Sequence, residues 1–172
     1  MSFSSEIKQE LSCQVPPARH CRLAEMAAIL SYCSHVESAD GDSPCVKMHT
    51  ENLAVARKYF TLLRKTFNIE MNVSVRQGRN PRGSRSYEVT SFGGLEPVKH
   101  MLVQNQCCKR AYIRGAFLAS GSMSDPEKGY HFEIVCSTEE KAEKLQEMLT
   151  GFGIDARITL VCRAAMPCLR CR

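Results

Sequence analysis

The sequence predicts an α+β protein built from two copies of one unit, each with the order helix, strand, helix, strand, and with one extra strand in the first half. A helix-like segment occurs twice, at residues 20–34 and 107–121, and the two copies align without a gap. A second motif also recurs, Thr-Glu followed by a helical pattern and then Phe-x-Ile, at residues 50–69 and 138–154. We therefore expect both halves to form one antiparallel sheet, with the repeated helices packed together at a pseudo-two-fold axis.

The elements of the first half follow from hydrophobic spacing and from capping residues. We expect Ser4 or Ser5 to cap the first helix, Pro16 to lie beyond its end, and Thr50 to cap the third helix. In chain order the expected elements are helix 5–11, helix 23–33, loop 37–44, strand 45–49, helix 51–67, strand 69–75, strand 86–90 and helix 96–103.

The second half repeats this plan. Ser137 with Glu140 three residues later is a capping-box signature, and Gly151 predicts the end of that helix. The expected elements are helix 107–121, strand 130–136, helix 137–149 and strand 154–161. The remaining residues show neither a period nor a cap, so we expect an irregular tail with an aberrant end. The predicted layout is an N-terminal helical segment at 1–18, a duplicated domain at 19–162 and the tail at 163–172.

The composition is that of an ordinary globular domain. The chain has 172 residues, 44% of them hydrophobic, with a formal net charge of +5, which is compatible with a polyanionic partner. The start of the sequence lacks the apolar core of a secretory signal, and no apolar run approaches the ~20 residues of a membrane span. We therefore expect no membrane partner and a cytoplasmic location, near the nucleoid if the protein binds DNA. In the cytoplasm the ten cysteines are expected to stay reduced.

Several stretches of this sequence are distinctive. They include Lys-Gln-Glu-Leu at 8–11, Cys-Arg-Leu-Ala-Glu-Met-Ala-Ala at 21–28 and Thr-Glu-Asn-Leu-Ala-Val-Ala-Arg at 50–57. The longest covers 107–131 and begins Cys-Cys-Lys-Arg-Ala-Tyr-Ile-Arg-Gly. These stretches resemble the WhiA family, which carries a degenerate form of the LAGLIDADG homing-endonuclease fold. The resemblance extends over roughly residues 1–160.

This resemblance implies a DNA-associated regulator of cell division, chromosome segregation and sporulation-type transcription. WhiA-like proteins also carry a C-terminal helix-turn-helix domain as their DNA reader, whereas this sequence leaves the family pattern after about residue 158. We therefore expect a chain truncated before that domain, with weak and non-specific DNA binding, and with protein partners in transcription or division as a second class. Two alternatives stay open: a residual LAGLIDADG endonuclease, and a protein-interaction scaffold without DNA binding.

The ends of the two repeated helices decide between a nuclease and a binding module. The LAGLIDADG resemblance implies one catalytic acid at the end of each helix, and the degenerate motif positions here are Cys33-Ser34 and Ser120-Gly121. Neutral thiol and hydroxyl groups are poor Mg²⁺ ligands, because that ion prefers hard oxygen ligands, usually carboxylates. We therefore expect a protein that is not an enzyme and has no catalytic residues.

A basic segment offers a candidate DNA contact. Four arginines, Arg76, Arg79, Arg82 and Arg85, lie without an acid in a Gly- and Pro-rich connection between two predicted strands. Guanidinium groups match phosphate oxygens, and four such contacts give a salt slope of roughly −3 to −4. That is enough for weak non-specific binding, although a mobile, solvated loop is the simpler interpretation.

The cysteines raise the question of a metal. His20-Cys21 and Cys107-Cys108 occupy matching positions at the starts of the two repeated helices, and a pseudo-dyad could bring them together as a Zn²⁺ site. Adjacent Cys-Cys ligands are sterically awkward, so packing is the favoured interpretation. Cys168 and Cys171 have Cys-x₂-Cys spacing but lack a second ligand pair. The sequence therefore predicts neither a metal nor a cofactor.

Overall fold

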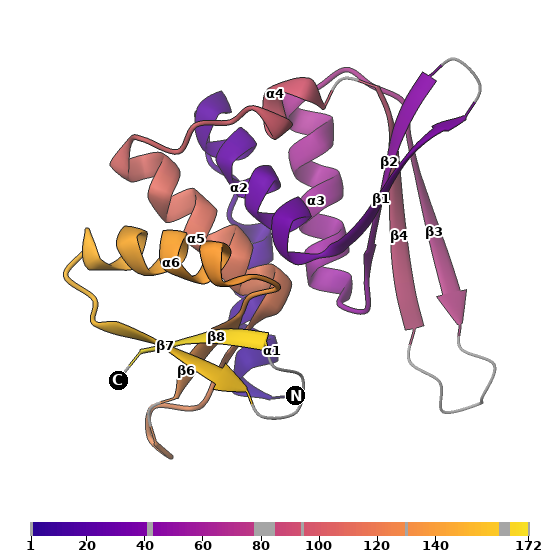
Figure 1. Ribbon diagram of the computed structural model, residues 1–172. Coiled ribbons are helices and arrows are strands. Elements are labelled where there is room, and N and C mark those ends of the chain that lie inside the picture. The colour runs from indigo at the N-terminus through magenta and orange to yellow at the C-terminus, as the bar shows by residue number, and fades with distance from the viewer. Residues whose placement is uncertain are drawn as a thin grey trace.

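The computed structural model describes residues 2–40, 43–77, 85–93, 95–129, 131–161 and 166–171. An N-terminal helix, α1 (Phe3–Cys13), precedes two halves with the same order of elements (Figure 1). The first half consists of α2 (Arg19–Tyr32), β1 (Ser34–Asp40), β2 (Ser43–Thr50), α3 (Leu53–Thr66), β3 (Met71–Gln77) and β4 (Arg85–Phe92), and is followed by α4 (Glu96–Lys99). The second consists of α5 (Gln106–Ser120), β5 (Gly121–Met123), β6 (Phe132–Val135), α6 (Glu139–Thr150), β7 (Ala156–Val161) and β8 (Met166–Cys171).

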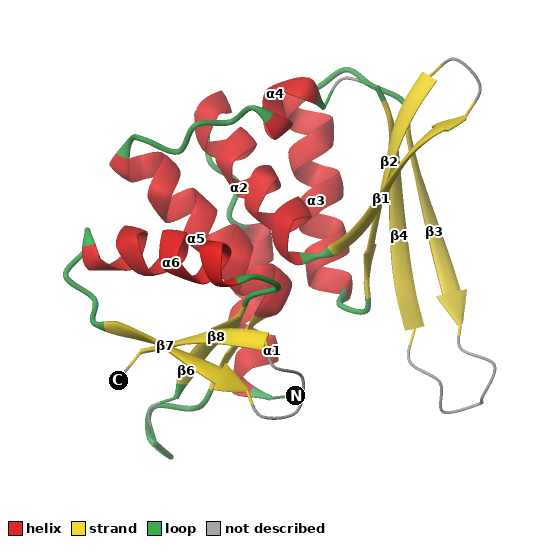
Figure 2. Ribbon diagram, in the orientation of Figure 1, coloured by secondary structure: helices red, strands yellow, loops and turns green. Residues whose placement is uncertain are grey.

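The α+β class and the duplication are confirmed, but two details of the predicted architecture are wrong. Each half has the order helix, two strands, helix, two strands, and each builds its own four-stranded antiparallel sheet. The strand orders are β1-β2-β4-β3 and β5-β6-β8-β7, which are the same topology. A single sheet does not form because the contact between the halves is made by helices, which lie between the two sheets in Figure 2.

The prediction of an irregular tail at 163–172 is also wrong for residues 166–171, which form β8. The strand β8 lies between β6 and β7, and the register pairs Leu169 with Ile134 on one side and with Ile158 on the other. Cys168 and Leu169 are fully buried. The segment lacks strand periodicity because it contains Pro167 and is short, so its conformation is set by its two neighbouring strands rather than by local preference.

The start of the predicted loop at 37–44 is a strand instead. The strand β1 forms a hairpin with β2, with Ser34 opposite His49 and Asp40 opposite Ser43. The polar residues of β1 do not alternate with apolar ones, so the sequence gives no strand signal there. Residues 41 and 42, the predicted turn, lie outside the described residues.

The helix starts differ from the predicted ones by a few residues. Ser2 rather than Ser4 or Ser5 caps α1, and its hydroxyl oxygen accepts the Ser5 N–H. Asn52 caps α3 and accepts the Ala54 N–H, while Thr50 accepts the N–H of Asn52 itself. In the second half Thr138 caps α6, one residue after the predicted Ser137. In each case the cap is the last residue with an extended backbone before the helix begins.

The helices cover one face of each sheet, and the other face points away from them (Figure 1). One core cluster joins α2, α3, β2 and β4, and the second joins α5, α6, β6 and β8. Leu11 of α1 packs against both clusters, so the N-terminal helix is part of the same folded unit. In the ranges that the structure describes, no helix combines the length and the apolar character that a bilayer crossing requires.

The repeated helices α2 and α5 pack directly against each other, as the duplication predicts. Small residues lie at this contact, and the four buried residues Cys21, Ala24, Cys108 and Ala111 form a cluster at one end of it. Small side chains let the two backbones approach closely. The pair therefore has two ends, one with the helix starts and the other with the positions where the resemblance implies catalytic acids.

Candidate nucleic-acid interface

The helix ends hold Cys33 and Ser120, as predicted from the sequence alignment of the repeats. Cys33 is the C-cap of α2, and its N–H donates to the Ile29 carbonyl oxygen at 2.8 Å. Ser120 is the last residue of α5, and its hydroxyl donates back to the Ala116 carbonyl oxygen at 3.4 Å. Ser34 opens β1 and Gly121 opens β5, so each motif passes directly into a strand.

Burial keeps the Cys33 side chain neutral. It raises the pKa of the Cys33 thiol to about 11, against the opposing influence of the nearby Lys8 ammonium. The same surroundings lower the pKa of Lys8 from its ordinary value, chiefly by burial. A protonated thiol and a hydroxyl that is already donating to the backbone are weak ligands for Mg²⁺. These two helix ends therefore present no negative charge near pH 7.

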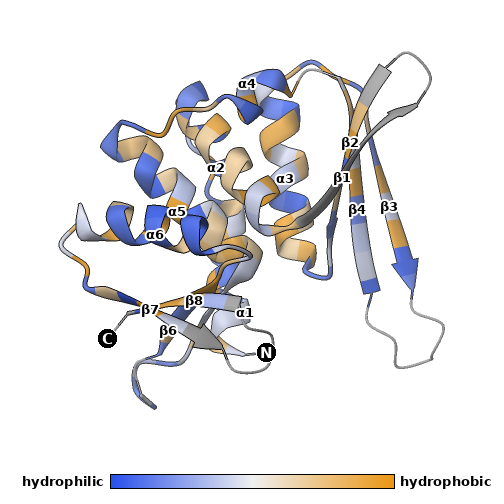
Figure 3. Cartoon of the chain, in the orientation of Figure 1, coloured by the Kyte–Doolittle hydropathy of each residue, from blue (hydrophilic) through white to orange (hydrophobic). Residues whose placement is uncertain are grey.

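The first sheet has a polar face opposite its core face. Along β2, Met48 is fully buried in the core whereas Lys47 and His49 point the other way, because strand side chains alternate. Lys47 pairs with Thr90 across the sheet, and His49 pairs with Glu88. Figure 3 shows the same alternation of hydrophobic and hydrophilic residues along β3.

Two of the four predicted arginines lie at one end of the first sheet, and of these Arg76 is on the polar face, whereas Arg85 is on the same face of β4 as the buried Val89. Arg76 is near the end of β3, with its side chain 70% exposed and its Nη2 atom 3.4 Å from Glu88 Oε2. Arg85 is exposed at the start of β4, opposite Gln77. Arg79 and Arg82 lie outside the described residues. The structure therefore places Arg76 and Arg85 at the same end of the β3-β4 pair.

The second sheet has a matching polar face. Arg157, Arg170 and Glu133 lie opposite one another on β7, β8 and β6, followed by Ser122 on β5. Glu133 Oε2 is 3.4 Å from Arg170 Nε, and Glu133 Oε1 accepts the Ser122 hydroxyl at 3.1 Å. Arg157 is exposed. Each sheet thus carries basic side chains on the face that the helices leave uncovered.

Arg157, Arg170 and Lys47 were not predicted as contact residues from the sequence. For Arg157 a signal exists, because Ala-Arg-Ile-Thr alternates in a predicted strand and fixes the face of each side chain. For Arg170 there was none, since its segment shows no strand period.

His20, Cys21, Cys107 and Cys108 converge at the opposite end of the α2-α5 pair. Their potential ligand atoms, one per residue, all lie within 4.8 Å of one another. Among the described residues, no other group of three or more His, Cys, Asp or Glu side chains brings its ligand atoms this close together. Burial, followed by the neighbouring thiols, raises the pKa of Cys21 to about 11. The sequence singled out these four residues, but the favoured interpretation there was that they pack in the helix contact and do not form a metal site.

A buried ionic cluster joins α2, α3 and α5. The Glu25 carboxylate is fully buried and accepts two hydrogen bonds from Arg114, from Nε and Nη2, both at 2.8 Å. Lys58 Nζ lies 3.0 Å from Glu25 Oε1 and also donates to the Leu11 and Gln14 carbonyl oxygens at the end of α1. The cluster therefore fixes the first helix against the central pair.

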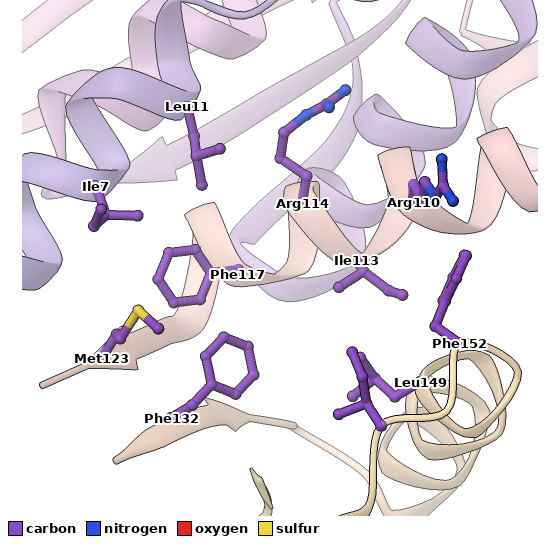
Figure 4. A pocket seen from close by; sticks show the side chains of 11 residues that line it. Ile7, Leu11, Arg110, Ile113, Arg114, Phe117, Met123, Phe132, Leu149 and Phe152 are labelled. Atoms are coloured by element: carbon purple, nitrogen blue, oxygen red, sulfur yellow. The ribbon is translucent and has the colours of Figure 1, made fainter. Parts of the chain in front are cut away.

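An apolar groove of about 490 Å³ runs between α1 and the second half (Figure 4). Ile7 and Leu11 line it from α1, facing Phe117 and Phe132, whose rings stack at a centroid distance of 5.4 Å. Arg110 lies at one end with its guanidinium 5.3 Å from the Phe152 ring centroid. The lining is apolar apart from two arginines, Arg110 and Arg114.

Comparisons with known proteins agree on one family. Residues 19–99 match the WhiA N-terminal LAGLIDADG-like domain, and residues 109–170 match the WhiA LAGLIDADG-like domain. The probable cell division protein WhiA of Lachnoclostridium phytofermentans is 46% identical over 93% of this chain and 58% of its own length. That of Lachnospira eligens is 40% identical over 92% and 56%. The chain thus spans little more than half the length of these curated relatives.

Two solved structures show the same fold. Full-length DUF199/WhiA from Thermatoga maritima superposes with a TM-score of 0.81 at 22% identity, covering 99% of this chain and 57% of that one. A crystal structure of I-DmoI, a homing endonuclease, in complex with DNA and Mn has a TM-score of 0.65 at 16% identity, covering 90% of each chain.

Proposed function

The chain belongs to the WhiA family, and from this membership we propose that it is a DNA-associated regulatory module that does not cut DNA. Its role would lie in cell division, with chromosome segregation and sporulation-type transcription as the processes it serves. The proposal places the protein in the cytoplasm, at the nucleoid.

The observation that carries the proposal is the pair of helix ends. Metal-dependent cleavage of a phosphodiester needs anionic oxygen ligands that hold Mg²⁺ at the scissile phosphate. Here one end carries the half-buried Cys33 thiol, whose raised pKa keeps it protonated, and the other the Ser120 hydroxyl, which donates to its own helix. Neither group supplies a charge for a hard cation, so the fold is retained without the chemistry that it performs in nucleases.

The uncovered sheet faces support DNA as the partner. Lys47 and Arg76 lie on the uncovered face of the first sheet, and Arg157 and Arg170 on that of the second. Phosphate contacts position a protein on a duplex without reading its sequence. Glu88 and Glu133 each pair with one of these arginines, which leaves a modest basic surface suited to weak, non-specific binding. The I-DmoI structures, with the same fold, contain bound DNA.

The test is fluorescence anisotropy of a labelled duplex over a salt series. Replacing Lys47 and Arg157 with Gln should reduce the slope of log K against log salt by about 2, because each lost phosphate contact removes about one unit. The matched control replaces Arg57 and Lys65, which are exposed on α3 in the helix layer, and should leave the slope unchanged. Equal effects of both pairs would favour a nonspecific charge effect over a sheet-face interface.

A protein-interaction scaffold without DNA affinity is the remaining alternative. The apolar groove beside Ile7 and Phe117 is the observation that favours it. In that case anisotropy would stay flat at low salt for the wild-type chain.

A further inference from the structure

The starts of α2 and α5 bring four soft ligands to one point. His20 Nδ1 lies 3.1 Å from Cys108 Sγ, 3.4 Å from Cys21 Sγ and 4.0 Å from Cys107 Sγ. Each helix contributes its second and third residues, so the cluster follows the pseudo-two-fold axis of the fold. Cys21 and Cys108 are buried, whereas His20 and Cys107 are exposed, so the cluster lies at the surface with an open side.

We propose that His20, Cys21, Cys107 and Cys108 bind one Zn²⁺ in a tetrahedral site that joins the two central helices. Zn–S bonds of about 2.3 Å and Zn–N bonds of about 2.0–2.1 Å place the ligand atoms of a tetrahedral site roughly 3.6–3.8 Å apart. The three nitrogen-to-sulfur distances scatter around that value, and all four ligand atoms fall within 4.8 Å of one another. Small rotations of the side chains complete the geometry without moving the helices.

The ligand set selects zinc over the cations that nucleases use. Three thiolates and one imidazole are soft to borderline ligands, which suit Zn²⁺ and exclude Mg²⁺ and Ca²⁺ as competitors. A set of four protein ligands also leaves no open position for a substrate or an activated water, as is usual in structural sites. The site is therefore a structural one, at the opposite end of α2 and α5 from Cys33 and Ser120.

The helix termini favour the charge that such a site carries. Three thiolates around Zn²⁺ leave a net negative charge, and each coordinated thiol releases its proton to solvent on binding. Neither Ala18, the N-cap of α2, nor Asn105, the N-cap of α5, makes a side-chain capping bond, and all four ligands lie in the first turns, at the positive ends of the two helix dipoles. Arg110 and Arg114 line the pocket beside Cys21 and Cys107 and add positive charge.

From sequence alone, the adjacent ligands in each pair made packing the favoured interpretation. The structure accommodates them because each of the two helices supplies only two of the four ligands. Each helix provides one buried residue and one exposed residue, and the small residues Ala24 and Ala111 let the two helix starts approach. No helix has to direct three side chains at one metal.

The test begins with the metal content of the full chain purified under reducing conditions without added chelator. We expect about one zinc per chain by elemental analysis. After removal of the zinc, Co²⁺ titration should give saturable absorption bands of tetrahedral thiolate-bound cobalt, which added Zn²⁺ abolishes. Protein without stoichiometric zinc that also gives no such bands would overturn the proposal.

Variants at the two exposed ligands test the assignment without disturbing the core. Cys107→Ser and His20→Ala should each weaken Zn²⁺ binding by at least about 100-fold, a loss at the upper end of that seen on changing residues around a metal. The control is Cys13→Ser, an exposed cysteine on α1 outside the cluster, which should bind as the wild type does. Circular dichroism confirms that each variant is folded.

A disulfide within the cluster is the competing outcome. Thiol counting and mass spectrometry on the purified chain distinguish the two: four-ligand zinc binding leaves all three cluster thiols reduced and recoverable after chelation. A disulfide between two of them in freshly purified, metal-free protein, or zinc retained by the Cys107→Ser, His20→Ala double variant, would contradict the assignment.

Discussion

Gly115 on α5 lies directly against the backbone of Glu25 on α2. A Cβ atom at position 115 would stand 2.6 Å from the Glu25 carbonyl oxygen and 2.9 Å from the Ala28 Cβ. Real atoms do not approach so closely, so only glycine permits the present separation of the two helices. The close approach is what brings the helix starts, and with them the four Cys and His side chains, into one cluster.

Gly115→Ala should destabilise the protein by about 1–3 kcal/mol, because the added methyl group forces α2 and α5 apart. Alanine is the better helix former, so an intrinsic propensity effect would have the opposite sign. Urea unfolding measures the change. The control is Gly151→Ala at the end of α6, where the nearest atom would be 3.3 Å away. A neutral or stabilising effect at position 115 would contradict the observed helix separation.

Glu25→Gln should cost about 3–5 kcal/mol of unfolding free energy, because Lys58 then keeps its buried charge without a counter-ion. Combining it with Lys58→Met should cost less than the sum of the two single changes, since the second removes the charge that the first left unpaired.

Denaturant unfolding of the four proteins in this cycle provides the measurement, with the exposed Glu147→Gln on α6 as a charge-matched control expected to change stability by less than about 0.5 kcal/mol. Additive effects would show that Glu25 and Lys58 do not interact across the helices.

Cys33 should make stability fall at alkaline pH. Burial raises the pKa of its thiol to about 11, so the folded protein holds this proton more tightly than the unfolded chain does. The resulting stabilisation is complete below the ordinary thiol pKa of about 9 and is lost as pH rises through about 11, amounting to about 3 kcal/mol.

Cys33→Ala should therefore lose less stability than the wild type between about pH 8 and pH 11. Urea midpoints at several pH values measure the difference, with Cys13→Ala as the exposed-cysteine control. Parallel pH curves for wild type and Cys33→Ala would show that this thiol is not protected from ionisation in the folded state.

Replacing Arg76, Arg79, Arg82 and Arg85 with Ser should flatten the salt dependence of DNA binding. The predicted reduction in slope is roughly 3–4 if all four contact phosphates. Arg76 and Arg85 bracket the connection between β3 and β4, at the same end of the first sheet. A slope unchanged in the quadruple variant would remove these four arginines from the interface and leave Lys47, Arg157 and Arg170 as the contacts.

The duplicated helices were predictable because their small and apolar residues repeat at a fixed spacing, and that repeat also identified Cys33 and Ser120. The strands β1 and β8 were not predictable, because the apolar residues of Ser34–Asp40 do not alternate with the polar ones and Met166–Cys171 contains a proline. Both become strands through pairing with segments distant in sequence, Leu169 with Ile134 for example. Such pairing is a tertiary effect that local patterns do not record.

The candidate functional sites, like the strands, were only partly predictable from the sequence. Matching positions in the repeats placed His20-Cys21 and Cys107-Cys108 as symmetry mates, but their distances depend on how closely α2 and α5 pack. That separation is set by Gly115 at a single point of contact. Arg170 was not predicted as a contact residue because its strand, β8, was not predicted. Its position on the proposed DNA surface is therefore seen only in the folded chain.

The most direct test of the account is a gel-shift titration of the full chain with linear and supercoiled DNA, across a salt series, with and without Mg²⁺. The account predicts a shift at low salt that weakens steeply as salt rises, with the DNA intact in every lane. Mg²⁺-dependent nicking or cleavage, or the absence of any shift at low salt, would contradict it.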